Sequence, residues 1–232
     1  MPALLFIDDD IDILESSKAY FTKLGYQVFC IRNARQALDM ISSAALSCII
    51  LDIAMPDLDG FSFCKRLREV SRVPVIFLSG LTEDEARIKS FMVGGDDYMC
   101  KPFNIKELEL RIQARIRDAD SLFRGETLQF GDLKIDTGRR LVSYKDKNGD
   151  FTTLQFDVLA FLARHPGQVY SYEQLYDLVW KTPIVGSRHN LQVVIACVRQ
   201  KLNALCDSQV YIETIPRKGY RFVESPSDHT TL

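Results

Sequence analysis

Several carboxylate, hydroxyl and ammonium side chains follow short apolar runs of the sequence, where they could carry out phosphoryl chemistry. Asp8 and Asp9 come directly after one apolar run, Asp52 ends another, and Ser79 and Lys101 close two more. Transfer of a phosphoryl group to an aspartate requires a carboxylate nucleophile and groups that neutralise the phosphoryl oxygens. Clustered carboxylates repel one another unless a cation lies among them, and oxygen-only ligands suit Mg²⁺ or Mn²⁺. The sequence therefore predicts a metal-assisted, phosphoryl-accepting site.

A second group of residues is basic. Residues 1–120 contain 15 basic and 19 acidic residues, whereas residues 121–232 contain 14 basic and 12 acidic residues. The net charge of −2 is therefore the sum of an acidic first half and a basic second half. Residues 181–221 contain seven basic residues against Asp207 and Glu213. This segregation predicts a face that binds a polyanion in the second half of the chain. The basic residues are Lys181, Arg188, Arg199, Lys201, Arg217, Lys218 and Arg221.

The elements that must position the acidic residues alternate between two patterns. Five strand-then-helix units predict a parallel sheet covered by helices on both faces, with ligands at the carboxyl ends of its strands. Strands this apolar should be central and buried on both sides. Apolar runs occupy 3–7, 27–31, 48–51, 73–78 and 98–100, and helical patterns occupy roughly 11–24, 34–43, 60–70, 83–93 and 105–118.

The second half of the chain has a different pattern of apolar residues. The apolar pattern lapses around 119–127, which indicates a short linker, and 128–153 shows short alternating segments typical of an antiparallel meander. Three helical patterns and a final hairpin with its turn at Pro216 to Gly219 complete this half. The three helical patterns cover about 155–165, 172–180 and 189–205.

Composition excludes several classes of protein. With 47% hydrophobic and 26% charged residues, the chain is of ordinary globular type, and no run approaches the roughly 18 apolar residues of a membrane span. The six cysteines are scattered without Cys-x-x-Cys spacing, so neither a zinc site nor a disulfide framework is indicated. We expect a soluble protein with a cytoplasmic location and no membrane partner.

The motifs LLFIDDD, LDIAMPDLDG, VIFLSG and GGDDYMCKPF, in this order, resemble the receiver domain of two-component response regulators over residues 2–119. The resemblance implies a flavodoxin-like (βα)5 fold with strand order 2-1-3-4-5 and a sensor histidine kinase as partner. It also implies roles for individual residues. Asp52 is the expected phosphoacceptor, Asp8, Asp9, Asp52 and the carbonyl of Ala54 the expected metal ligands, Ser79 and Tyr98 the expected switch pair, and Lys101 the expected phosphate-contacting lysine.

The second half contains TLQFDVLAFLARHPGQVYSYEQLYDLVW and TIPRKGYRF, which resemble the α+β winged helix-turn-helix domain of the OmpR/PhoB class over residues 127–224. An apolar stripe formed by Leu191, Ile195, Val198 and Leu202 should dock the helix that begins near Asn190 and turn its other side towards DNA. Val194, Ala196 and Cys197 occupy places where the class commonly has His or Arg. The expected DNA-contacting residues are Arg188, His189, Gln192, Val193, Arg199, Gln200, Arg217, Lys218 and Arg221.

The same resemblance implies how activity would be controlled. Receivers of this class form a homodimer through helix 4, strand 5 and helix 5, and two charge pairs match: Arg87 with Glu107, and Asp97 with Arg111. Ordinary solvated helix charges are the alternative, because exposed ion pairs are each worth only about 0–1 kcal/mol. The loop from Lys181 to Ser187 is where this class can meet RNA polymerase. Cys197 should lie on the DNA-facing side, where an inert thiol is more common than a redox switch.

We therefore predict a receiver at 1–119, a linker at 120–127, a winged-helix domain at 128–226 and a tail at 227–232. The leading interpretation is a phosphorylation-controlled transcription regulator of a two-component system that binds double-stranded DNA and is not an enzyme. One alternative is a phosphorylation-independent DNA-binding protein whose receiver serves only for dimerisation. A remote alternative is a haloacid-dehalogenase-like phosphohydrolase, which also begins with strand-end aspartates but does not explain Asp52 followed by Met55-Pro56 and Gly60.

Overall fold

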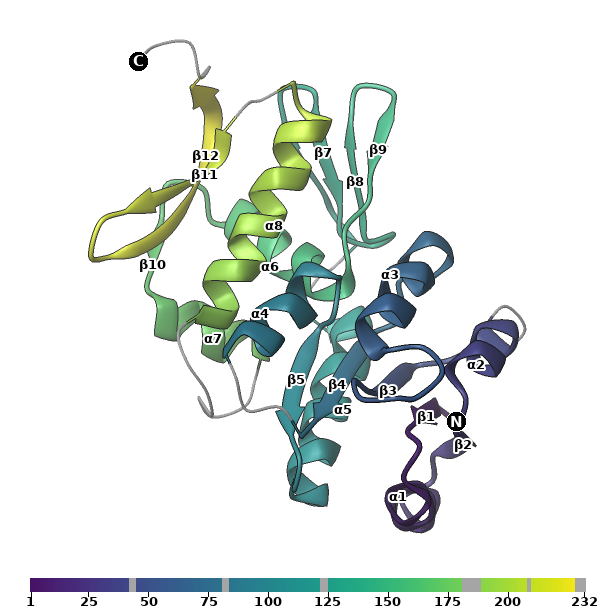
Figure 1. Cartoon of the computed structure of the whole chain (residues 1–232). Helices are drawn as coiled ribbons and strands as arrows, with labels where there is room; N and C mark the ends of the chain where they lie inside the picture. The colour runs from purple at the N-terminus through teal and green to yellow at the C-terminus, as the bar shows by residue number, and fades with distance from the viewer. Residues whose placement is uncertain (42–44, 81–83, 122–124, 181–188, 208–209, 228–232) are drawn as a thin grey trace. The chain divides into compact units, whose positions relative to one another are not determined.

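The computed structural model describes residues 1–41, 45–80, 84–121, 125–180, 189–207 and 210–227. The chain divides into two compact units, Met1–Arg117 and Asp118–Leu232, which are considered separately (Figure 1).

The first unit is built on a five-stranded parallel sheet with the order β2-β1-β3-β4-β5, which confirms the predicted topology. The helices α1 to α5 connect the strands in strict alternation. Strand β4 begins two residues later than expected, after Pro74, which has no N–H to donate to a neighbouring strand. The strands are β1 (Ala3–Ile7), β2 (Gln27–Ile31), β3 (Cys48–Asp52), β4 (Val75–Ser79) and β5 (Asp97–Cys100), and the helices are α1 (Ile11–Lys23), α2 (Ala34–Ile41), α3 (Gly60–Val70), α4 (Asp84–Met92) and α5 (Ile105–Ser121).

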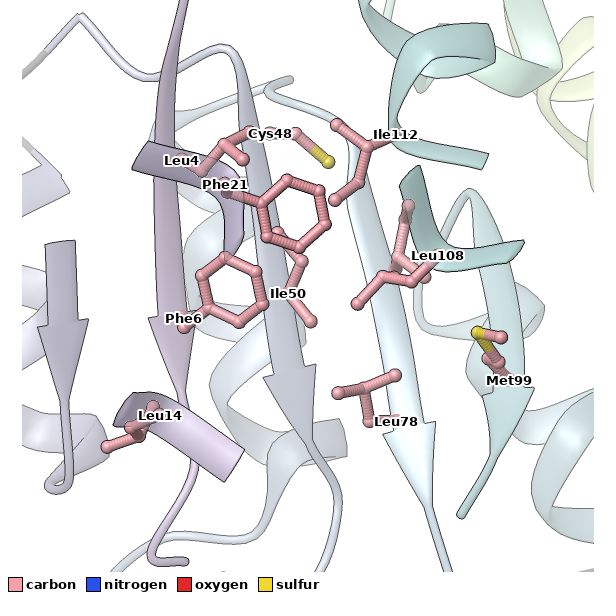
Figure 2. Packing of buried hydrophobic residues seen from close by; sticks show 11 residues of the cluster. Leu4, Phe6, Leu14, Phe21, Cys48, Ile50, Leu78, Met99, Leu108 and Ile112 are labelled. Atoms are coloured by element: carbon pink, nitrogen blue, oxygen red, sulfur yellow. The ribbon is translucent and has the colours of Figure 1, made fainter. Parts of the chain in front are cut away.

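The three central strands, β1, β3 and β4, are buried along their whole length, because side chains that alternate along a strand meet apolar partners on both faces of the sheet. The expectation of a central, fully buried strand is wrong for β2, which lies at an edge of the sheet and is only partly buried. Figure 2 shows one of these faces, where Phe6 and Ile50 from the strands pack with Phe21 from α1 and Leu108 from α5. The rings of Phe6 and Phe21 lie 5.5 Å apart. On the opposite face Phe77 packs against Phe61 of α3. Burial of each such side chain contributes about 1.5–3 kcal/mol to the stability of the fold. This packing fixes the positions of the strand ends that carry the acidic residues.

The second unit combines a four-stranded antiparallel sheet, three helices and a smaller three-stranded sheet. The meander expected over 128–153 is present, and it is followed by α6, whose first turn is closed by a capping box between Thr152 and Gln155. The short strand β10 was not predicted. The elements of the second unit are β6 (Thr127–Phe130), β7 (Leu133–Asp136), β8 (Leu141–Tyr144), β9 (Lys147–Gly149), α6 (Thr153–Arg164), β10 (Val169–Tyr170), α7 (Tyr172–Trp180), α8 (His189–Leu205), β11 (Val210–Ile215) and β12 (Gly219–Ser227).

Helix α8 docks as the apolar stripe predicts. Leu191, Ile195, Val198 and Leu202 are all buried. Val194 is buried as well, so its side chain is not available to contact DNA. The strands β11 and β12 form the final hairpin, and its turn falls at the predicted residues. We call this hairpin, residues 210–227, the wing.

Candidate phosphoryl-accepting pocket and nucleic-acid interface

The acidic residues meet at the carboxyl ends of β1 and β3. Asp8 follows β1 and Asp52 is the last residue of β3, and both side chains are buried, whereas Asp9 is exposed. One carboxylate oxygen from each of these three residues lies within 4.8 Å of the others. Asp10 points elsewhere, because its carboxylate caps α1 by accepting hydrogen bonds from the backbone N–H groups of Asp12 and Ile13. The topology therefore brings together the three carboxylates that the sequence singled out.

Lys101 faces the same pocket from the end of β5. Its Nζ lies 2.8 Å from Asp8 Oδ2 and 3.1 Å from Asp52 Oδ1. Burial by itself would lower the pKa of Lys101, but its hydrogen bonds to the two carboxylates outweigh burial and raise that pKa. The ammonium group thus stays charged and partly balances the two buried carboxylates. The Lys101-Pro102 peptide bond is cis.

The pocket fits a hard divalent cation. Burial is the largest influence on Asp8 and raises its pKa, although Lys101 and the backbone N–H of Asp10 act in the opposite direction. A single ammonium group therefore leaves the Asp8 carboxylate in an unfavourable environment. The donors are all oxygen atoms, which is the ligand type that Mg²⁺ and Mn²⁺ prefer.

Ser79 and Tyr98 lie on the two strands beside the pocket. Ser79 is the last residue of β4 and is fully buried, and Tyr98 lies within β5 with 7% of its surface exposed. The backbone N–H of Lys101 donates a hydrogen bond of 2.7 Å to the carbonyl of Ser79, which ties the ends of the two strands together. Tyr98 is thus directed into the protein, and its role in a switch stays a prediction.

The loop after β3 is held close to the sheet by Gly60. A Cβ atom at Gly60 would come within 2.3 Å of the carbonyl oxygen of Asp52, so only glycine allows this approach. The N–H of Gly60 donates to the carbonyl of Ile53, and Asp59 caps the helix that follows. Ala54, between these contacts and Asp52, is exposed, and the use of its carbonyl as a metal ligand stays a prediction.

The residues expected at a dimer interface pair within the chain. Arg111 is buried and contacts Asp97 at 2.8 Å and Glu107 at 2.7 Å. The charge of Asp97 is the largest influence on Arg111 and raises its pKa. Arg87 pairs with Asp84 on the same helix. Contacts of these residues with a second copy stay a prediction.

The exposed side of α8 is uncharged over the described side chains. Gln192, Ala196 and Gln200 recur every four residues and are all exposed. Val193 and Cys197 beside them are half-buried, and burial raises the pKa of the Cys197 thiol. Arg188 and the side chain of His189, both expected to contact DNA, lie outside the described residues.

The two basic side chains further along α8 are bonded to the protein. Arg199 donates from Nε to the carbonyl of Ile212 and from Nη2 to Thr214 Oγ1, each at 2.9 Å. Burial lowers the pKa of Arg199. Lys201 donates to Gln155 Oε1 at 2.7 Å on another side of the helix. The contact between Arg199 and a DNA phosphate that the resemblance implies would therefore have to replace two bonds to the wing.

The tip of the wing carries exposed positive charge. Arg217 and Lys218 are both exposed, and Arg217 has a φ of 62°, the left-handed conformation that its turn requires. Arg221 lies further along β12, where its Nη2 is 2.6 Å from Glu213 Oε2. Glu213 was not predicted as this partner, although counting back from the hairpin turn puts the two residues opposite each other.

The pocket and the two folds define a two-domain signalling protein with a receiver and a transcription-regulating domain. Residues 4–113 match the response regulator receiver domain family, and residues 146–222 match the C-terminal domain family of transcriptional regulatory proteins. The transcriptional regulatory protein SrrA of Staphylococcus aureus is 28% identical over 97% of both chains.

Solved structures narrow the class further. The response regulator DrrB of Thermotoga maritima, described as an OmpR/PhoB homolog, is 31% identical, and the match covers 96% of this chain and 99% of DrrB with a TM-score of 0.51. A mutant form of RitR shares the fold, with a TM-score of 0.78, 23% identity and coverage of 97% of this chain and 100% of RitR. The chain belongs to the OmpR/PhoB family of response regulators. In the described part of the chain no helix is both long and apolar enough to cross a membrane.

Proposed function

We propose that this protein is a cytoplasmic, phosphorylation-controlled transcription regulator in which a sensor histidine kinase phosphorylates Asp52. The observation that carries the proposal is the convergence of Asp8, Asp52 and Lys101 in one buried pocket, with Lys101 Nζ within 3.1 Å of both carboxylates. The second unit matches a family of transcriptional regulatory domains, which does not support the phosphohydrolase alternative. The only reaction that the protein would promote is transfer of the phosphoryl group from the phosphodonor to Asp52.

The chemical step uses residues of the pocket. An oxygen of the Asp52 carboxylate attacks the phosphorus atom of the phosphohistidine, the P–N bond breaks, and the leaving nitrogen takes up a proton. Lys101, already bonded to Asp52, would interact with the phosphoryl oxygens as they gain negative charge. The Ser79 hydroxyl would donate a hydrogen bond to one of these oxygens. Asp8, Asp9, Asp52 and the carbonyl of Ala54 would hold Mg²⁺ or Mn²⁺, which neutralises charge on the phosphoryl group when it is bound.

We further propose that phosphorylation is transmitted through β4 and β5. Ser79 and Tyr98 lie on these neighbouring strands, so a Ser79 hydroxyl drawn towards the phosphoryl group would change the packing around Tyr98. The receivers then pair through α4, β5 and α5, with Arg87 facing Glu107 and Asp97 facing Arg111 across the homodimer. Arg111 already pairs with Asp97 and Glu107 in its own chain, so dimerisation would exchange these ion pairs for pairs between the two receivers. The new pairs would fix how the two receivers align more than they would strengthen the dimer.

The paired second units would bind double-stranded DNA. Helix α8 is of a size that fits the major groove, and the wing tip with Arg217 and Lys218 reaches a neighbouring phosphate backbone. Arg221 is a further candidate for the minor groove if it leaves Glu213. Residues 181–187, which lie outside the described residues, are the proposed contact for RNA polymerase.

The test compares the wild-type chain with Asp52→Asn, and with Asp12→Asn as a matched control in an exposed position on α1. Each protein is treated with beryllofluoride and Mg²⁺, and its mass in solution and its affinity for DNA are measured. We expect the wild type and Asp12→Asn to shift to dimer and to bind DNA more tightly, and Asp52→Asn to do neither. Equal affinities with and without beryllofluoride in all three proteins would favour the phosphorylation-independent alternative.

A further inference from the structure

We infer that Gln192 and Gln200 determine the DNA sequence that this regulator reads, and that each selects an adenine in the major groove. The inference rests on the proposed DNA binding and goes beyond it by naming the bases that are recognised.

The packing of α8 settles which of its side chains can face a ligand. The buried stripe from Leu191 to Leu202 holds one side of the helix against the domain. The opposite side presents the row Gln192, Ala196 and Gln200. Within the described part of the chain neither glutamine carboxamide has a hydrogen-bond partner, so both are available to a ligand.

The described cations of the helix are bonded to other parts of the domain. Arg199 is bonded to Ile212 and Thr214 of the wing strand β11, and Lys201 is bonded to Gln155 of α6. Over the described side chains of α8, the groups left to read bases are therefore carboxamides and small apolar side chains. Charged guanidinium groups, which favour guanine, are not among them.

The position of Gln192 supports a role in recognition. Gln192 lines a groove of about 350 Å³ together with Tyr172 at the start of α7 and with Arg217 and Lys218 of the wing tip. Phosphates that contact these two cations would place the edge of a base near Gln192. The groove thus joins a backbone-binding element to a base-reading one.

The chemistry of the face matches A·T base pairs. A carboxamide offers one donor and one acceptor, which pair with N7 and the N6 amino group of adenine. The exposed methyl group of Ala196 and the half-buried Val193 suit the methyl group of thymine. Eight residues separate the two glutamines, which is about 12 Å along a helix and corresponds to roughly three to four base pairs.

The test is a selection of binding sequences from random double-stranded DNA by the full chain with beryllofluoride and Mg²⁺. We expect each half-site to contain two adenines about three to four base pairs apart. Gln192→Ala should lose the preference at one of these positions and Gln200→Ala at the other. Each loss should weaken binding to the selected site by about 5- to 150-fold.

Two further variants sharpen the result. Gln200→Arg should replace the preference for adenine by one for guanine at a single position, because arginine pairs with O6 and N7 of guanine. Gln129→Ala removes an exposed glutamine on β6, away from α8, and should leave the selected sequence unchanged.

Three outcomes are distinguishable. Selected sites without the paired adenines overturn the inference while leaving the proposed function intact, and so does an unchanged preference in both alanine variants. Failure of the wild type to enrich any sequence and to bind any DNA overturns the proposed function and the inference with it. Unfolding of a variant is recognised from the fluorescence of Trp180, the only tryptophan of the chain, which lies in the second unit.

Discussion

Replacement of Arg199 by alanine should destabilise the second unit without removing a DNA phosphate contact. The guanidinium group makes two hydrogen bonds of 2.9 Å to β11 and lies 5.7 Å from the centre of the Tyr220 ring. A hydrogen bond from a charged group contributes about 1.5–3 kcal/mol. Because Arg199 is only half-buried and Thr214 is exposed, we take the lower end and expect a loss of about 2–4 kcal/mol in the free energy of unfolding.

The assay separates stability from DNA contact. Unfolding of the second unit in urea is followed through Trp180 fluorescence, and an m-value of about 1–3 kcal/mol per M turns the expected loss into a midpoint shift on the order of 1–2 M. DNA binding is measured at several salt concentrations under conditions where the variant is folded. Lys218→Ala is the matched control, because its exposed charge should leave stability unchanged and reduce the salt slope by about 1.

The two variants should therefore behave in opposite ways. Arg199→Ala should unfold at a lower urea concentration and keep the wild-type salt slope, and Lys218→Ala should do the reverse. If Arg199→Ala unfolds at the wild-type midpoint and loses as much salt slope as Lys218→Ala, then Arg199 contacts phosphate and the assignment of its guanidinium to the wing is refuted.

Three further predictions concern other sites. Arg111→Ala should cost about 3–5 kcal/mol of receiver stability in urea unfolding followed by circular dichroism, because it leaves the buried Asp97 without its cation; a loss below about 1 kcal/mol contradicts this. Gly60→Ala should destabilise the receiver by at least about 1–3 kcal/mol and slow its phosphorylation by acetyl phosphate, because the new methyl group would clash with the carbonyl of Asp52. A variant with the rate and stability of the wild type would show that the loop can move to accommodate the methyl group. Burial raises the pKa of Cys197, so its alkylation in the native protein should keep accelerating as the pH rises above the ordinary thiol pKa; a rate that levels off near neutral pH, followed by peptide mapping, would reveal a reactive thiolate.

The acidic pocket could be predicted from the sequence because it depends on topology alone. Asp8 and Asp52 each end an apolar run, and parallel strands joined by helices bring their carboxyl ends to one edge of the sheet. No knowledge of side-chain rotation is needed for this step. The same holds for the docking stripe of α8, since the period of an α-helix fixes which residues share a face.

The partners of the basic residues could not be predicted in the same way. Arg199 lies at the edge of the exposed side of α8, and whether its long side chain reaches DNA or β11 depends on how closely the wing packs against the helix. Arg221 pairs with Glu213 because of the register between β11 and β12. Net charge along the sequence locates a basic segment, but a packed fold decides which of its charges remain available.

This difference changes how the regulator would divide affinity from specificity. If the charges of α8 are held by β11 and α6, backbone affinity comes mainly from the wing tip, where Arg217 and Lys218 are exposed. Such contacts are non-specific and salt-dependent, so one protomer with a neutral reading helix should bind weakly and discriminate through few bases. Two protomers on paired half-sites double the number of carboxamide contacts. Phosphorylation of Asp52, by pairing the receivers, would then control the sequence discrimination of this protein as much as its affinity.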